Sequence, residues 1–296
     1  MMDAWILAGL ALAVLLAWLV PAWRRRRALA QPLPPEQVAV LARNVAQYAG
    51  MDQAQRRKLA RMVRQFLFEK KFVGCAGLEL TDEMRVTIAG QACLLLLGRA
   101  AEQGPAVLYP ALHTILVYPG AFLVPRKEVD VAGVVTEARQ DLLGESWGDG
   151  RVILSWDHVR RAGHPEPPNH NVVLHEFAHQ LDSESGSTNG APYLGSRERY
   201  RSWSQVLSRD YANLRHEAMF GMRGVLDHYG ASSPAEFFAV ATESFFEQPH
   251  QLSARHPALY GEFLKYYRID PRQWQPEPVA ITMEPDPPGM VYGQWR

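Results

Sequence analysis

Residues 171–182 read NVVLHEFAHQLD and place His175 and His179 four positions apart, with Glu176 beside the first histidine. Positions i and i+4 lie one turn apart on the same face of a helix, so both imidazoles can reach one ion at about 2.0 to 2.1 Å. Glu176 is rotated by about 100° from His175, which keeps its carboxylate beside such an ion rather than on it. The stretch therefore predicts a helix with a zinc site and Glu176 as its general base.

The same stretch also fits a packed helix whose two histidines are merely hydrogen-bonded to their neighbours. Asp182, seven residues after His175 on the same face, weakens that alternative, because it can accept a hydrogen bond from a ligand histidine. Prolines at 165, 167 and 168 block an earlier helix, and Asn169 or Asn171 can cap a new one. We expect the helix to begin at these asparagines.

A catalytic zinc site needs a third ligand, and residues 232–249, SSPAEFFAVATESFFEQP, form a suitable acidic helix. Glu236 lies in its first turn, where the helix meets the preceding loop, and is the expected ligand. Glu243 lies two turns further among phenylalanines, so its carboxylate needs a hydrogen-bonded partner and is expected to support the site. Two histidines and one glutamate leave one zinc position open, which favours a catalytic over a structural ion.

The amino-acid composition argues against several other kinds of partner and site. The chain has 296 residues and is 47% hydrophobic, enough for one large domain or two small ones. Lysine plus arginine equal aspartate plus glutamate at 31 each, so no net charge points to nucleic acid as a partner. Cys75 and Cys93 lack metal-type spacing, which argues against a thiolate zinc site or a disulfide framework and indicates a reducing compartment.

The N-terminus predicts a membrane anchor. Residues 5–23 carry no charge, and a helix of that length nearly spans a hydrocarbon core of about 30 Å. The positive charges, Arg24 to Arg27, follow the apolar run instead of preceding it as they do in a secretory signal. By the positive-inside rule the rest of the chain is cytoplasmic. An interfacial helix or a signal peptide are the alternatives.

The rest of the chain predicts an α+β fold, helices first, then a small sheet, then helices. Helical patterns cover residues 36–70, 81–98 and 169–267, the last broken by a loop at 183–196. β-rich runs occur at 106–110, 114–124 and 150–156. The expected domains are an anchor with its basic flank at 1–27, a Pro-rich linker at 28–35, the catalytic domain at 36–270 and a loosely held Pro-rich tail at 271–296.

Three ordered motifs carry a family resemblance: GESWGDGRVILSWDHV at 144–159, HEFAHQLD at 175–182 and YGASSPAEFFAVATESFF at 229–246. Together the motifs resemble the Mlc titration factor A family of bacterial zinc peptidases, whose core is similar to that of anthrax lethal factor. The resemblance covers roughly residues 36–275. It implies a zincin-like domain of the gluzincin type, one Zn²⁺ per chain and peptidase activity on small peptides.

The resemblance also implies roles for individual residues. It makes His175, His179 and Glu236 the zinc ligands and Glu176 the base, and Tyr229 matches a tyrosine that faces the zinc. Taken alone, Tyr229 fits a packing residue better; with the match it is expected to donate to the developing oxyanion. For a bacterial chain, the predicted anchor lies in the inner membrane, with the lipid bilayer as a partner.

Two function classes therefore compete. The first is a membrane-tethered zinc peptidase with a peptide or protein substrate, which the edge of strand 150–156 holds in extended form. The second is a membrane-anchored binding protein that sequesters a transcriptional regulator with little hydrolysis. The family's partner is a repressor of the glucose system, but the anchor is a departure from the family. Glu176, which a pure binding protein does not need, favours the peptidase.

Overall fold

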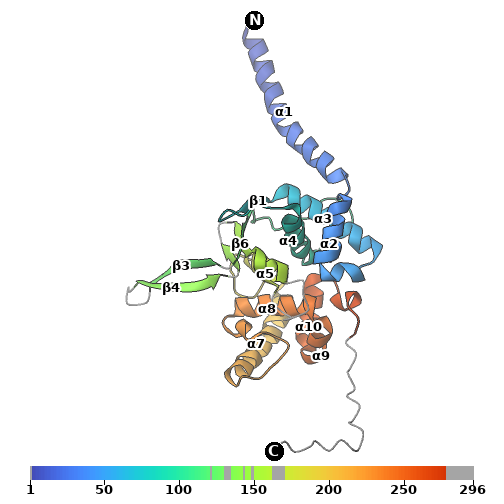
Figure 1. Cartoon of the computed structure of the whole chain (residues 1–296). Coiled ribbons are helices and arrows are strands. Elements are labelled where there is room, and N and C mark those ends of the chain that lie inside the picture. Colours follow the sequence, from blue (N-terminus) through green and yellow to red (C-terminus); the bar gives the residue numbers. More distant parts are fainter. Residues whose placement is uncertain are drawn as a thin grey trace, which may run out of the picture.

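The computed structural model describes residues 2–120, 122–129, 135–142, 144–147, 150–161 and 171–277. The chain is mostly helical with a small, largely parallel sheet, as the α+β prediction requires. Figure 1 shows the early helices α2, α3 and α4 at one end of the body and the later helices α7 to α10 at the other. The residues predicted for the site lie in the part of the chain that follows the sheet.

The N-terminal helix α1, Met2–Ala30, extends away from this body (Figure 1). Within the described part of the chain, no helix is long and apolar enough to cross a membrane. The structure thus gives no support to the transmembrane anchor expected at residues 5–23.

Two capped helices build the first half of the core. A capping box starts α3, in which the Asp52 side chain accepts a hydrogen bond from Gln55 N and the Gln55 side-chain oxygen accepts one from Asp52 N. Thr81 caps the start of α4, and its side chain accepts from Met84 N at 3.2 Å. The fully buried apolar residues of α3 are Leu59, Met62, Val63 and Phe66. The early elements are α2 Pro35–Asn44, η1 Ala46–Gly50, α3 Gln53–Glu69 and α4 Asp82–Leu94.

The four-stranded sheet has the order β1-β2-β6-β5. Its first three strands are parallel, and β5 runs antiparallel to β6 at the edge. A separate antiparallel hairpin, β3 with β4, projects from the body (Figure 1). The strands are β1 Lys71–Gly74, β2 Thr114–Tyr118, β3 Phe122–Val129, β4 Val135–Leu142, β5 Gly144–Trp147 and β6 Arg151–Ser155.

Two expectations for the sheet were wrong. Residues 106–110 form no strand, because Tyr109 adopts a φ of 46° and its hydroxyl donates to Ala92 O at 2.7 Å, which buries the ring away from any ladder. Residues 150–156 do not provide the sheet edge, because β6 lies between β2 and β5. The strand β5 takes the edge position instead.

The helices after the sheet form an aromatic core. Phe245 of α8 stacks on Tyr267 of α10 with 5.4 Å between ring centroids, and Trp203 of α7 stacks on Phe263 at 5.4 Å. This packing fixes α7, α8 and α10 against one another. The late elements are α5 Trp156–Arg161, α6 Val172–Ser183, α7 Arg197–Met219, η2 His228–Ala231, α8 Pro234–Glu247, α9 Pro249–Arg255, α10 Pro257–Tyr267 and η3 Pro271–Trp274.

The C-terminal segment closes onto the N-terminal helices. Trp274 is only 5% exposed, and its indole N–H donates to Gln55 Oε1 at 2.9 Å. Gly50 packs so closely on it that a Cβ would lie 2.2 Å from Trp274 O. The packed body thus runs past the boundary expected at residue 270. The tail from residue 278 onward lies outside the described residues.

Candidate metal centre

The helix that carries the histidines starts at Asn171, one of the two asparagines expected to cap it. Asn171 caps α6, and its side-chain oxygen accepts from Val173 N at 3.2 Å and Leu174 N at 3.0 Å. Asn169 lies outside the described residues. One face of α6 is fully buried and holds the helix in the core; it consists of Leu174, Phe177, Ala178 and Leu181.

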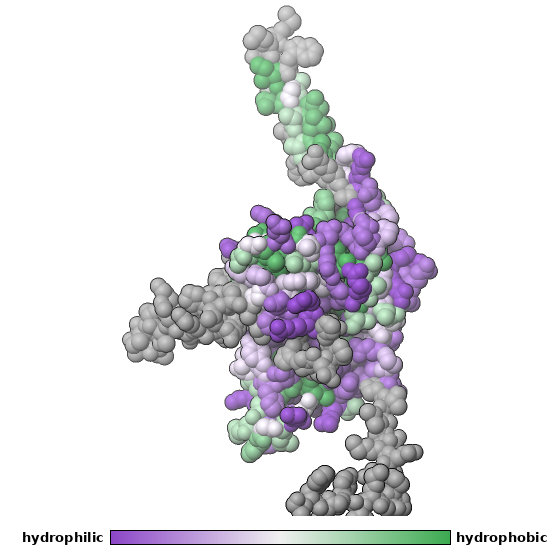
Figure 2. Space-filling model, viewed as in Figure 1, coloured by the Kyte–Doolittle hydropathy of each residue, from purple (hydrophilic) through white to green (hydrophobic). Residues whose placement is uncertain are grey.

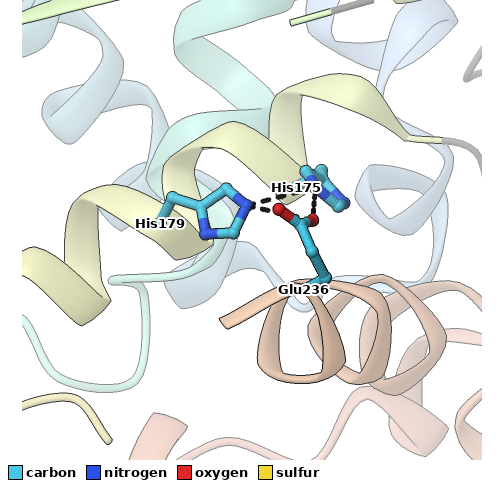
Figure 3. Close-up of side chains that lie close together, drawn as sticks. All are labelled: His175, His179 and Glu236. Atoms are coloured by element: carbon cyan, nitrogen blue, oxygen red, sulfur yellow. Dashed lines mark hydrogen bonds and ion pairs between the residues drawn. The ribbon is translucent and has the colours of Figure 1, made fainter. Parts of the chain in front are cut away.

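His175 and His179 of α6 meet Glu236 of α8 at a single point (Figure 3). Glu236 Oε2 lies 2.9 Å from His175 Nε2 and 3.4 Å from His179 Nε2, and the two imidazole nitrogens are 3.2 Å apart. Among the described residues, these three form the group of histidine, cysteine, aspartate and glutamate that can hold a metal ion. The structure brings together the three residues that the sequence predicts as ligands.

The spacing of these donor atoms fits zinc. Four ligand atoms placed tetrahedrally at 2.0 to 2.1 Å from a zinc ion lie about 3.3 Å from one another. The three separations of 2.9, 3.2 and 3.4 Å match the edges of such a tetrahedron. Two imidazoles and a carboxylate are also a donor set that zinc prefers. Their assignment as ligands remains a prediction that this geometry favours.

Glu243 contacts the His175 ring at Nδ1, the nitrogen that does not face the metal position. Its Oε1 lies 2.8 Å from His175 Nδ1, and its Oε2 accepts the backbone N–H of Asn171 at 2.8 Å. Because an ionised carboxylate only accepts, Nδ1 carries the proton of this hydrogen bond, and Nε2 is turned toward the metal position. Glu243 is only 4% exposed, and this is the hydrogen-bonded partner that its apolar surroundings require.

Asp182 does not make the hydrogen bond to a histidine that is expected from the sequence. It is fully buried, and its Oδ2 accepts the backbone N–H of Gly190 at 2.7 Å. Within the described residues, Nδ1 of His179 has no hydrogen-bond partner. The reason is geometric: the loop after α6 folds back and presents its amides to Asp182. Burial raises the pKa of Asp182, and these amides oppose the rise.

The charges at the centre suit a cation. Burial alone would raise the pKa of Glu236, but its hydrogen bonds with His175 and His179 outweigh burial and lower it to about 2. Burial likewise opposes the charged form of His175, yet the hydrogen bonds from Glu236 and Glu243 hold its pKa well above the usual value. Two carboxylates therefore stabilise positive charge at this point.

Glu176 and Tyr229 flank the three donors. Glu176 is 4% exposed on α6, and Tyr229 lies in η2 with its ring 5.9 Å from that of His175. Asp227 fixes the start of η2 by accepting from Tyr229 N at 2.7 Å. Burial, followed by the charges of Glu236 and Glu176, raises the pKa of Tyr229 to about 12. Tyr229 thus keeps its phenolic proton at neutral pH and remains a donor.

Sequence reasoning missed two contacts that shape this centre. Asn171 also donates through Nδ2 to Glu247 Oε1 at 3.0 Å, which ties the start of α6 to the end of α8. Gly190 packs directly on Pro234, the first residue of α8. The Asn189-Gly190 pair signals a turn, but a sequence pattern does not show which distant residue that turn touches.

Comparison with known proteins supports the sequence resemblance. The model of the glucose-regulated metallopeptidase family M90 matches residues 20–268. An uncharacterized protein of Synechocystis is 40% identical over 250 residues, which cover 84% of this chain and 89% of the relative. Mlc titration factor A proteins of Yersinia pestis and Yersinia pseudotuberculosis are each 31% identical over 268 residues, covering 88% of this chain and 94% of theirs.

Proposed function

The chain belongs to the M90 family of glucose-regulated metallopeptidases, and on that premise we propose that it is a zinc-dependent peptidase that hydrolyses peptide bonds. The observation that carries the proposal is the convergence of His175, His179 and Glu236 at tetrahedral spacing. Glu176, which lies next to His175 on the same helix, supplies a base that a purely structural ion does not require.

The roles of the residues follow from their positions. His175, His179 and Glu236 would hold the zinc, which when bound polarises the scissile carbonyl and lowers the pKa of water to about 7. The Glu176 carboxylate takes a proton from the attacking water and passes it to the leaving amine. The Tyr229 hydroxyl, protonated at neutral pH, donates to the carbonyl oxygen as negative charge develops there.

The substrate is proposed to bind in extended form along β5. This strand is the last in the sheet order and packs against α6, which carries the histidines. Its outer backbone groups can pair with a peptide strand by β-addition. The proposal moves the expected substrate edge from β6 to β5, since β6 is enclosed between two strands.

The test is Glu176→Gln. The change keeps the size of the side chain and removes the basic carboxylate, so we expect full zinc content and a loss of about 10²- to 10⁴-fold in hydrolysis of a chromogenic peptide. Glu198→Gln, an exposed glutamate at the start of α7, is the matched control and should keep full activity. A zinc-loaded Glu176→Gln that cleaves at the wild-type rate refutes the proposal.

A second candidate is a binding protein that sequesters a transcriptional regulator. Two observations favour it: the name of the Yersinia relatives describes factors that titrate Mlc, and an apolar cluster stands exposed after α7. Figure 2 shows apolar surface in the region of α7. The cluster consists of Met219, Phe220 and Met222, which are 77%, 63% and 51% exposed. If inactive Glu176→Gln still supports the cellular phenotype, binding is the function.

The cellular location is a separate proposal that rests on the sequence alone. The uncharged run at residues 5–23, followed by Arg24 to Arg27, favours attachment to the bacterial inner membrane with the catalytic domain in the cytoplasm. Full-length protein should then resist extraction from membranes by alkaline carbonate. Recovery of the whole protein in the extracted fraction would refute this attachment.

A further inference from the structure

We propose that Gly190, held by Asp182, is a positioning residue that sets the first turn of α8 so that Glu236 reaches the two histidines. The inference rests on the zinc site of the proposed function. It assigns a role to the loop at residues 183–196 and to the buried carboxylate of Asp182, which accepts a hydrogen bond from that loop.

Gly190 is fixed through both of its backbone polar groups. Its N–H donates to Asp182 Oδ2 of α6 at 2.7 Å, and its carbonyl accepts from Trp203 Nε1 of α7 at 2.9 Å. All three residues are buried, and neither Asp182 nor Trp203 is more than 2% exposed. Gly190 is therefore anchored to two helices before it contacts the third.

The third contact is unusually close. A Cβ on Gly190 would lie 2.4 Å from Pro234 O and 2.9 Å from Pro234 C, both backbone atoms of the first residue of α8. Backbone atoms in a helix cannot rotate away as a flexible side chain can. Only a residue without a side chain allows the loop to approach the start of α8 this closely.

Glu236 follows Pro234 by two residues in the same helical turn. Its backbone N–H is held by Ser233 Oγ at 3.2 Å, so the carboxylate moves with the turn. Zinc–ligand distances hold within about 0.2 Å in a sound site. Relieving the contact from 2.4 Å to at least the 3.0 Å that a real Cβ tolerates demands a larger shift than that. A side chain at 190 therefore displaces a zinc ligand.

These contacts link α6 to α8 by two separate routes. Asp182 of α6 holds Gly190, Gly190 abuts Pro234 of α8, and Glu236 of α8 returns to His175 on α6. Together these contacts fix the first turn of α8 against α6. Glu243 fixes the same helix two turns later by contacting His175 and Asn171. The carboxylate ligand is thus secured from both sides.

The test measures zinc affinity by competition with a chromogenic chelator in full-length protein. Gly190→Ala should weaken zinc binding about ten- to hundredfold, the range for losing a supporting contact. Gly195→Ala is the matched control in the same loop: its φ of 83° resembles the 79° of Gly190, but nothing lies within 4 Å of its Cβ. Because the two φ angles are similar, backbone strain alone predicts the same effect in both variants.

A second pair covers the case in which Gly190→Ala does not fold. Asp182→Asn keeps an oxygen that accepts from Gly190 N and should retain most of the zinc affinity, whereas Asp182→Ala should lose it as Gly190→Ala does. Equal affinity in Gly190→Ala and Gly195→Ala, or in Asp182→Ala and wild type, overturns the inference while the zinc site stands. A wild type that binds no zinc removes the proposed function as well.

Discussion

The α6–α8 joint is the contact that His175 of α6 makes with Glu236 and Glu243 of α8. It differs from the end of α7 in how far its side chains are buried and fixed. At the joint, His175 and Glu243 are largely buried, and hydrogen bonds fix the direction of each side chain. At the end of α7, Met219 and Phe220 are 77% and 63% exposed. A metal site requires donors fixed to a fraction of an ångström, whereas a surface that meets a partner requires access. Changes at the joint should therefore act on zinc, and changes after α7 should not.

The largest expected effect comes from His179→Ala. Removing one of three donors should abolish tight zinc binding and, with it, peptide hydrolysis. His216→Ala is the matched control, because His216 is an exposed histidine on α7. Metal content by mass spectrometry should fall from about one zinc per chain to near zero in the first variant and stay unchanged in the second. Equal zinc content in both would remove the contrast between the two regions.

The second-largest effect is expected from Tyr229→Phe, because Tyr229 is exposed like the end of α7 but lies near a predicted metal ligand. Tyr229 is 53% exposed yet lies 5.9 Å, centroid to centroid, from the His175 ring. Loss of its hydroxyl should lower turnover about 10²- to 10³-fold with zinc content and KM nearly unchanged, because an oxyanion donor acts in the transition state. Steady-state kinetics on a chromogenic peptide give the answer. A change confined to KM would make Tyr229 a substrate contact instead.

Glu243→Ala should have a smaller effect on the metal. It frees His175 Nδ1 and Asn171 N from their acceptor and should weaken zinc affinity about ten- to hundredfold. Glu243→Gln keeps an oxygen acceptor and should lose less. Chelator competition measures both. An affinity of Glu243→Ala equal to that of wild type would show that the buried joint does not position the histidine.

The sequence predicted the elements of the site better than their connections. His175, Glu176 and His179 follow from helical spacing, since a helix fixes which side chains share a face, and Glu236 follows from its position in the first turn of an acidic helix. The hydrogen bond predicted from Asp182 to a histidine is absent among the described residues, because its partner Gly190 comes from a loop whose path depends on tertiary packing. Residues 106–110 failed as a strand for the same reason: a β-rich composition does not reveal that Tyr109 adopts a φ of 46° to fill the core.

The anchoring of α7 to the rest of the body predicts a pH dependence that is separate from zinc. Asp210 is 3% exposed and is hydrogen-bonded to His256 Nδ1 and Arg209, each at 2.9 Å. Burial alone would raise the pKa of Asp210, but these two hydrogen bonds hold it below the usual value. A lowered folded pKa gives stability that is present above the unfolded pKa of about 3.9 and lost as pH falls through the lower folded value.

Asp210→Asn should accordingly lower the free energy of unfolding by about 1 to 2 kcal/mol at pH 7. The difference from wild type should shrink as pH falls from about 4 through the lowered pKa of folded Asp210, where the wild-type side chain loses its charge as well. Urea denaturation at the two pH values checks this. A difference that is constant with pH would assign the effect to packing rather than to charge.

The smallest effect is expected from Phe220→Ser. Because the ring is 63% exposed, the free energy of unfolding should change by no more than about 0.5 kcal/mol. Zinc content and hydrolysis of small peptides should equal those of wild type, as shown by thermal denaturation and the peptide assay. Loss of zinc in this variant would mean that the end of α7 and the α6–α8 joint are not independent.

X-ray absorption at the zinc edge of the purified wild-type protein gives the decisive test of the zinc site. We expect one zinc per chain with nitrogen and oxygen neighbours at about 2.0 to 2.2 Å, including two imidazoles. His175, His179 and Glu236 are the only residues that we expect as protein ligands within the described part of the chain. A spectrum with sulfur at about 2.3 Å, or with a single imidazole, would contradict this expectation.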